Sequence, residues 1–411
     1  MKNAYEFITD RTIAGITAVP GFTASGVHCG IRKNKAKKDL ALIMADRDCA
    51  AAAVYTTNLV KAAPIYLTME HLKNNRARGI IANSGNANAC APNDMAAAKK
   101  MTEAIAAQTG CKPEDFIVNS TGVIGQVLPI DNICAAIPSL AESLSRDGKP
   151  AAEAIMTTDT FSKTAAVRLA LGGKTVTIGG IAKGSGMIHP NMATMFAFLT
   201  TDCRISPSLL QAALSESARK TYNRISVDGD TSTNDMTAIL ASGAAGNPEI
   251  TAMGEDYGTF LNALNAINLK LAKDIARDGE GATKLITCHV SGASSEDKAV
   301  VIAKSVISSS LVKAAMFGAD ANIGRVLCAM GYSGAEIKPD IIDISYISNA
   351  GQIIVCKQGK GLAFDEELAK RVLTQKEITI EVALNDGEHY AEAYGCDLTY
   401  DYVKINGDYR S

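Results

Sequence analysis

The segment Ala182–Asp202 holds the residues best suited to chemistry. A glycine-rich bend, Lys183-Gly184-Ser185-Gly186, and a Pro190-Asn191 turn lead to Thr194, which opens an apolar run expected to form a strand. A threonine hydroxyl is a weak nucleophile until a base removes its proton. Thr194 can therefore act as a nucleophile only if a base lies beside it.

Cleavage of the peptide bond before Thr194 would supply that base from the same residue. The α-amino group that cleavage frees has an unperturbed pKa of about 7.7 to 8. It is tethered close to the hydroxyl and can accept its proton near neutral pH. Taken alone, however, a threonine before an apolar strand is more often a strand residue whose hydroxyl bonds the backbone. Both interpretations stay open at this stage.

Two other segments resemble nucleotide-binding motifs but fail the spacing. Gly173-Lys174-Thr175 lacks the earlier glycine of a phosphate-binding loop, because Arg168 stands in its place. Gly184-Ser185-Gly186 is followed by His189 where a dinucleotide fingerprint needs glycine. We interpret both as turns.

Composition narrows the class of protein. The chain has 411 residues, which predicts two domains or one large layered domain with a smaller one. Its net charge of -2 indicates neither nucleic acid nor a membrane as partner, and the basic segment Arg32–Lys38 is expected to be a solvated loop. Residues Met1–Pro20 lack the apolar block of a signal peptide, and no stretch nears the roughly 18 apolar residues of a membrane span. These observations predict a cytoplasmic protein.

The ten cysteines and five histidines are dispersed along the chain, without a CxxC pair or a Cys/His cluster. Disulfide scaffolds and zinc sites need closely spaced ligands. We therefore expect reduced thiols and no metal site.

The elements that must position Thr194 are helices and strands in alternation. We expect strands over residues 40–45, 49–55, 78–82, 116–119, 174–181, 194–200, 284–290, 342–347, 352–357 and 377–384, and helices over 94–108, after Ser206-Pro207, and over 260–277. A mild shift to small polar residues at Ser291–Asp297 suggests a domain boundary. The fold class is therefore α/β or α+β, with layers of helix over sheet.

The longer sequence pattern resembles the ornithine acetyltransferase family, also called glutamate N-acetyltransferase, nearly from end to end. The matching strings are Thr57–Pro64, Asn83–Cys90, Asn119–Gly122, Thr157–Asp159, Lys183–Thr201, Asp228–Asp235, Asp278–Lys284, Phe317–Arg325 and Tyr402–Ser411. So many ordered matches are specific, and they favour the catalytic interpretation of Thr194.

The resemblance implies cleavage between Ala193 and Thr194 into an α chain of residues 1–193 and a β chain of residues 194–411. Thr194 would attack the amide of N-acetylornithine, form an acetyl-enzyme and release ornithine. Glutamate would then take the acetyl group as N-acetylglutamate, in a ping-pong reaction of arginine biosynthesis. Some family members also acetylate glutamate from acetyl-CoA, and the sequence leaves that activity open. We expect no cofactor, with acetyl-CoA possible only as a co-substrate.

The resemblance assigns Thr121 and Gly122 to an oxyanion hole, which stabilises the charge of a tetrahedral intermediate. The local sequence agrees, since a Thr-Gly pair just past a strand end presents one hydroxyl and one unhindered amide. The other interpretation is a glycine turn with a capping threonine.

The resemblance also implies substrate contacts from Thr157, Lys183, Thr194, Glu280, Asn406 and Ser411. Lys183 could pair with a substrate carboxylate, or lower the pKa of the Thr194 amine by charge repulsion. Glu280 would hold the amino end of ornithine. By themselves these residues would be interpreted as an exposed strand-end lysine, a solvated glutamate, a loop hydroxyl and a frayed tail.

The fold implied is an αββα sandwich with the layering of N-terminal-nucleophile hydrolases but its own connectivity, over residues 1–293. A smaller C-terminal α/β domain would cover residues 294–411, and two α with two β chains would form a heterotetramer. Two other functions remain as alternatives. One is an N-terminal-nucleophile aminopeptidase or amidase, and the other is a metabolite-binding protein that never cleaves.

Overall fold

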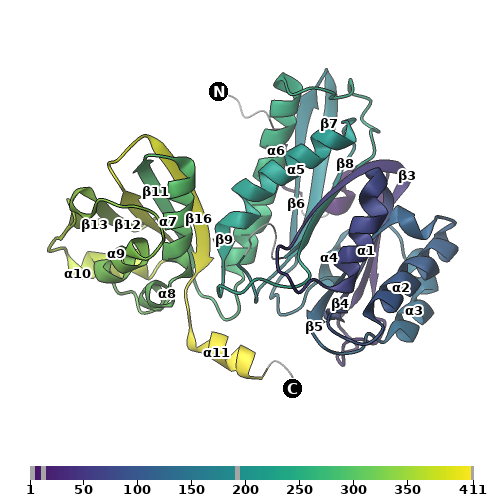
Figure 1. Cartoon of the computed structure of the whole chain (residues 1–411), viewed down its shortest axis with the longest axis horizontal. Helices are drawn as coiled ribbons and strands as arrows, with labels where there is room; N and C mark the ends of the chain where they lie inside the picture. Colours follow the sequence, from purple (N-terminus) through teal and green to yellow (C-terminus); the bar gives the residue numbers. More distant parts are fainter. Residues whose placement is uncertain (1–4, 11–14, 190–194, 409–411) are drawn as a thin grey trace. The chain divides into compact units, whose positions relative to one another are not determined.

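The computed structural model describes residues 5–10, 15–189 and 195–408 (Figure 1). These residues form two compact units. The first comprises residues up to Gly184 with Pro190–Asn223 and Thr231–Ala272, and the second comprises Ser185–His189, Arg224–Asp230 and Lys273–Ser411. Each unit has a sheet of its own.

The first unit is built on a nine-stranded sheet in the order β1-β6-β7-β8-β10-β3-β4-β5, with β2 paired to β3. Its strands are β1 (Tyr5–Phe7), β2 (Phe22–Val27), β3 (Leu40–Tyr55), β4 (Arg76–Asn86), β5 (Phe116–Val123), β6 (Lys163–Leu171), β7 (Lys174–Lys183), β8 (Phe196–Thr201) and β10 (Met236–Ala241). β3 is one strand where the sequence predicted two. Its register with β4 shifts between Met44 and Cys49, and β4 pairs with both parts of the strand. Residues 40–45 also pair with β2, and residues 50–55 pair with β10.

The two halves of this sheet pack face to face. Ile181, Phe198 and Leu240 from one half share a buried cluster with Ile43 and Ile80 from the other. This inner cluster lies between two sheet layers.

Helices cover the two outer faces. α2 (Asp94–Thr109) and α3 (Ile130–Glu142) share a second buried cluster with β3, β4 and β5. On the opposite side, Ile267 and Leu271 of α6 (Glu255–Arg277) approach Gly180 of β7, and α5 (Pro207–Lys220) packs on β3. The layers thus follow the predicted order of helix, sheet, sheet and helix, and Figure 1 shows the two groups of helices. Two shorter helices complete the unit, α1 (Ala63–His71) and α4 (Lys149–Ala154).

Local signals explain where several helices begin and end. α5 starts with a proline after Ser206, as predicted, although the Ser206 side chain makes no capping hydrogen bond. α2 ends at Gly110, whose φ of 68° is the left-handed conformation that commonly terminates helices.

The second unit holds a seven-stranded sheet in the order β14-β13-β12-β15-β11-β16-β9. Its strands are β9 (Ile225–Ser226), β11 (Leu285–Ala293), β12 (Asp343–Ser348), β13 (Gly351–Lys357), β14 (Lys360–Gly361), β15 (Glu377–Ala383) and β16 (His389–Cys396), and its helices are α7 (Glu296–Ser308), α8 (Ser310–Phe317), α9 (Ile323–Gly331), α10 (Glu366–Leu373) and α11 (Tyr400–Gly407). α7 packs on β11 and β16, and α10 packs on β12 and β13.

The division between the units differs from the predicted boundary at residues 293 and 294. β11 pairs with both β15 and β16, so it is an interior strand of the second sheet. The main division therefore falls after Ala272. The small polar stretch Ser291–Asp297 is the link from β11 into α7 rather than a domain boundary.

The ten cysteines carry free thiols, as predicted. Within the described residues, no three His, Cys, Asp or Glu side chains gather as a metal ion would require. In the same part of the chain no single helix is long and apolar enough to cross a membrane. Only α7 and α8 taken together have that length and composition, and the chain bends by 59° between them.

Candidate active site

Thr121 and Gly122 lie within β5, not past its end as the sequence predicted. β5 runs parallel to β4 and places the two residues opposite Ser84 and Gly85. Side chains alternate along a strand, so Thr121 shares a face with Ile117 of the inner cluster. Thr121 is buried there, and no described residue forms a hydrogen bond with its hydroxyl.

Gly122 has a φ of 133°, which residues with a side chain rarely adopt. A Cβ atom at this position would lie 2.3 Å from the carbonyl carbon of Gly85 and 2.5 Å from the nitrogen of Asn86. Only glycine fits between the two strands. The backbone of β4 can approach β5 this closely because Gly122 carries no side chain.

Lys183 ends β7 and is 8% exposed, so it is not the exposed strand-end lysine of the simpler interpretation. Its Nζ lies 5.5 Å from the centre of the Phe196 ring. Its charge acts on two buried carboxylates, Asp159 and Asp235. Ionisable groups whose pKa is shifted by burial and by a charged neighbour are candidates for a functional site.

Asp235 precedes β10 and is 3% exposed. Burial raises the pKa of its carboxyl well above the usual value, although the charge of Lys183 and hydrogen bonds from Ser232 act in the opposite direction. Its Oδ2 atom is buried without a hydrogen-bond partner among the described residues. An unsatisfied buried acceptor is rare in folded proteins.

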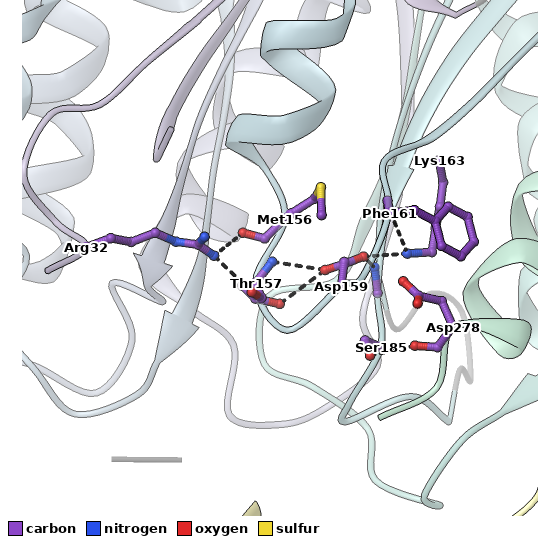
Figure 2. Close-up of polar contacts among 9 residues, drawn as sticks. Arg32, Met156, Thr157, Asp159, Phe161, Lys163, Ser185 and Asp278 are labelled. Carbon is purple, nitrogen blue, oxygen red and sulfur yellow. Dashed lines mark hydrogen bonds and ion pairs between the residues drawn. The ribbon is translucent and has the colours of Figure 1, made fainter. Parts of the chain in front are cut away.

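Asp159 connects the Thr157 loop to the end of β7 (Figure 2). Its Oδ1 accepts hydrogen bonds from Lys163 Nζ and from the Gly184 N–H, each at 2.7 Å. Its Oδ2 accepts the N–H of Thr157 at 2.9 Å and the Thr157 hydroxyl at 3.5 Å. Burial raises the pKa of Asp159, but the charges of Lys163 and Lys183 outweigh burial and lower the pKa to about 2.

Asp159→Asn is expected to lower the free energy of unfolding by about 3 kcal/mol at pH 7, because buried donors lose a charged acceptor. The folded pKa of about 2 lies below the usual 3.8. Asp159 therefore stabilises the fold fully above pH 4 and loses that effect as the pH falls through 2. The difference between wild type and variant should shrink from pH 7 to pH 3.

Urea unfolding followed by far-UV circular dichroism measures this difference, since the chain contains no tryptophan. The control is Asp131→Asn, which removes an exposed ion pair with Lys100 at 2.6 Å and should cost less than about 1 kcal/mol. Equal, small effects of both variants would contradict the structural role of Asp159.

Glu280 is buried in the second unit, so the interpretation as a solvated loop glutamate does not hold. The Asn406 amide of α11 donates to Glu280 Oε2 at 2.7 Å. A Cβ atom on Gly186 would lie 2.4 Å from Glu280 Cδ, which shows that the Gly186 backbone packs directly against the carboxylate. The structure thus brings together two residues that the resemblance assigned to the substrate.

Hydrogen bonds to one carboxylate and one backbone carbonyl fix the chain before the predicted cleavage position. Asp228 accepts the N–H groups of Met187 at 2.6 Å and of Ile188 at 2.9 Å, and burial raises its pKa. The Ser185 hydroxyl donates to the carbonyl of Asp278 at 2.6 Å. Successive hydrogen bonds of this kind restrict the backbone that leads toward Thr194.

Ala193, Thr194 and Ser411 lie outside the described residues. The predicted strand over 194–200 is present as β8 from Phe196. Its neighbour β10 runs parallel, and the N–H of Met236 donates to the carbonyl of Met195 at 3.0 Å. Thr194 directly precedes Met195 in the sequence.

The sequence interpretation missed the buried polar partners Asp159, Lys163 and Asp235. It was wrong about Arg32, which is not simply solvated, because its guanidinium donates to the carbonyls of Met156 and of Thr157, the latter at 3.2 Å. Asp159 and Asp235 could have been found from the sequence, because both belong to strings that resemble the family.

Comparisons with known proteins agree with this resemblance. A sequence model described as the ArgJ family matches residues 23–411. The "Arginine biosynthesis bifunctional protein ArgJ 1" of Clostridium acetobutylicum is 53% identical over 398 residues, which cover 96% of this chain and 97% of the relative. The "Arginine biosynthesis bifunctional protein ArgJ" of Symbiobacterium thermophilum is 52% identical over 400 residues, with 97% and 98% covered.

Two solved structures are also similar. The bifunctional protein argJ from Bacillus halodurans is 47% identical, with 52% of this chain and 97% of that chain covered and a TM-score of 0.49. The ornithine acetyltransferase from Mycobacterium tuberculosis, complexed with ornithine, is 37% identical, with 46% and 100% covered and a TM-score of 0.42.

Proposed function

The chain belongs to the ArgJ family and is an acetyltransferase of arginine biosynthesis, and we propose that it moves acetyl from N2-acetylornithine to glutamate through an acetyl-Thr194 intermediate. The observation that carries this proposal is the similarity to named relatives at 53% identity over 96% of the chain. The buried Lys183 and Glu280 support it, because an amino-acid substrate needs a cation for its carboxylate and an anion for its amino group.

The proposed maturation step is cleavage between Ala193 and Thr194. The Thr194 hydroxyl attacks the Ala193 carbonyl carbon, an ester bond forms, and the Thr194 nitrogen leaves as an amine. Water then hydrolyses the ester, which frees the hydroxyl and leaves a carboxylate on Ala193. The products are the α chain of residues 1–193 and the β chain of residues 194–411, and we propose that two of each assemble as a heterotetramer.

In each half of the transfer the Thr194 amine acts as the base. It takes the hydroxyl proton while Thr194 Oγ1 attacks the acetyl carbonyl of acetylornithine, and ornithine leaves with a proton. Glutamate then attacks the acetyl-enzyme by its amino nitrogen, and N-acetylglutamate is released. The Thr121 hydroxyl and the Gly122 N–H are proposed to stabilise the oxyanion in both steps, and removal of one such donor typically lowers kcat by about 10² to 10³.

The substrate contacts proposed are Thr157, Lys183 and Thr194, together with Glu280, Asn406 and Ser411. Lys183 would bind a carboxylate and Glu280 the amino end of ornithine. No cofactor is required, because Thr194 supplies both nucleophile and base. The relatives are named bifunctional, and we propose acetyl-CoA as a second acetyl donor to Thr194.

Incubation of the cleaved protein with N-acetylornithine, with and without glutamate, tests this function. Acetylglutamate should form only when glutamate is present. Acetate without acetylglutamate would favour the aminopeptidase or amidase alternative and would overturn the transferase. A parallel reaction with acetyl-CoA and glutamate, without acetylornithine, should also yield acetylglutamate if the enzyme is bifunctional. Both products are measured by mass spectrometry.

A further inference from the structure

The loop before β10 is joined to the end of β5 by one buried side chain, Asn234. Asn234 is only 3% exposed. Its Nδ2 donates to the carbonyl of Ser120 at 2.7 Å and to the carbonyl of Ala87 at 2.6 Å. The Thr233 hydroxyl donates to its Oδ1, so both ends of the amide are engaged and its orientation is determined.

The two carbonyls bracket the pair Thr121 and Gly122. Ser120 precedes Thr121, and its carbonyl belongs to the peptide group that carries the Thr121 N–H. Ala87 directly follows β4, and its N–H donates to the carbonyl of Val123, the residue after Gly122, at 2.9 Å. Asn234 therefore bonds the backbone directly before the pair, and through Ala87 it is linked to the residue directly after the pair.

A reciprocal contact makes the connection stiffer. The Asn119 amide donates to the carbonyl of Asn234 at 3.1 Å, while its Oδ1 accepts the N–H of Ser120 at 2.9 Å. The Asn234 side chain thus bonds the backbone of β5, and the Asn119 side chain of β5 bonds the backbone of Asn234. A buried network in which every donor and acceptor has a hydrogen-bond partner is rigid and favours a single arrangement of its groups.

Asn234 also ties the pair to the strand that follows Thr194. It stands two residues before Met236, which pairs with Phe196 at the start of β8. The strands β5 and β8 belong to different halves of the sheet. Asn234 lies just before β10, the neighbour of β8, and its side chain bonds β5 in the other half.

We propose that Asn234 is a positioning residue that sets the place of the Thr121 hydroxyl and the Gly122 N–H relative to the start of β8. This inference rests on the proposed function, in which those groups stabilise an oxyanion formed at Thr194. Stabilisation of that kind needs donors within about 3 Å of the oxyanion, and a displacement of about 1 Å can cost 10²-fold in rate.

Asn234→Ala is expected to lower kcat for acetyl transfer about 10²-fold with little change in KM, because binding groups are retained while oxyanion donors move. Asn234→Asp, which keeps the side-chain volume but removes both donors, should lose at least as much. Circular dichroism verifies that the variants fold, and kcat is expressed per cleaved chain, as measured on a denaturing gel.

Asn247→Ala is the matched control. Asn247 is equally buried, beyond the other end of β10, and its Nδ2 also donates to two carbonyls, those of Pro248 at 2.8 Å and Arg204 at 3.1 Å. This variant loses the same kind of side-chain hydrogen bonds to two carbonyls, but its kcat should stay within about 3-fold of the wild-type value. An equal loss of kcat in both variants, or a rise in KM alone for Asn234→Ala, would overturn the proposal.

Thr121→Ala separates this inference from the proposed function. If Asn234 acts through the pair, the loss in the double variant Asn234→Ala/Thr121→Ala should be smaller than the product of the single losses. A multiplicative loss would refute the role of Asn234. Wild-type kcat in Thr121→Ala would overturn the oxyanion pair itself. A large loss in Thr121→Ala with wild-type kcat in Asn234→Ala would remove only the positioning role.

Discussion

Thr194→Ala is expected to remain a single 43.0 kDa chain and to transfer no acetyl group. The variant lacks the hydroxyl that attacks the Ala193 carbonyl, and without cleavage it also lacks the free amine that serves as base. Wild type should give two bands, each of about half the mass, on a denaturing gel. Thr194→Ser keeps a hydroxyl and should still cleave.

The control for this experiment is Thr200→Ala in the same strand, β8. The Thr200 hydroxyl is buried and donates to the carbonyl of Ile16 at 2.6 Å, so its loss should lower stability but not prevent cleavage. This comparison distinguishes a nucleophile from an ordinary strand threonine. An intact, active wild-type chain, or normal cleavage in Thr194→Ala, would refute the mechanism and favour the alternative of a binding protein that never cleaves.

Gly122→Ala is expected to destabilise the fold by about 3 to 5 kcal/mol and to abolish measurable transfer. The new Cβ would meet the backbone of Gly85 at 2.3 Å, and a backbone carbon cannot turn aside as a flexible side chain does. β4 and β5 would have to separate at the position where the Thr121 hydroxyl and the Gly122 N–H are presented. Thermal unfolding and the acetylornithine assay measure the two effects.

Gly125→Ala provides a matched control three residues further along. Gly125 also has a left-handed backbone, with a φ of 81°, but no atom lies within 4 Å of an added Cβ. It should therefore cost only about 1 kcal/mol from backbone strain and leave transfer nearly unchanged. Similar losses in both variants would show that backbone conformation alone, rather than the close approach of β4, explains the requirement for glycine.

Local patterns predicted many elements well. Alternation over residues 174–181 anticipated β7, and the Ser206-Pro207 signal anticipated the start of α5. The predicted bounds and domain assignment were wrong where pairing between distant segments determines the extent of a strand or the sheet to which it belongs. β3 continues through residues 46–48, which have no strand partner, because β4 pairs with it on both sides of that gap. β11 belongs to the second unit because its partners β15 and β16 lie about 90 residues or more further on.

The candidate site shows the same contrast. The order of the strings that resemble the family, rather than any single residue, predicted Thr194 as the nucleophile, Thr121 and Gly122 as the oxyanion pair, and Lys183 and Glu280 as substrate contacts. It could not show that Lys183 and Glu280 are buried, since a strand-end lysine and a loop glutamate are exposed in most proteins. Burial depends on what packs over a residue, and this is set by segments far away in the chain.

What the sequence determined by itself is the family, because its ordered strings match over nearly the whole chain, and with it the candidate residues for the proposed chemistry. What only the tertiary structure decided is which groups hold them in place. Asn234 reaches Ser120 across 114 positions of the chain, and Asp159 reaches Gly184 across 25. Such contacts leave no local periodicity, since each depends on a single side chain meeting a distant backbone group after the layers have packed.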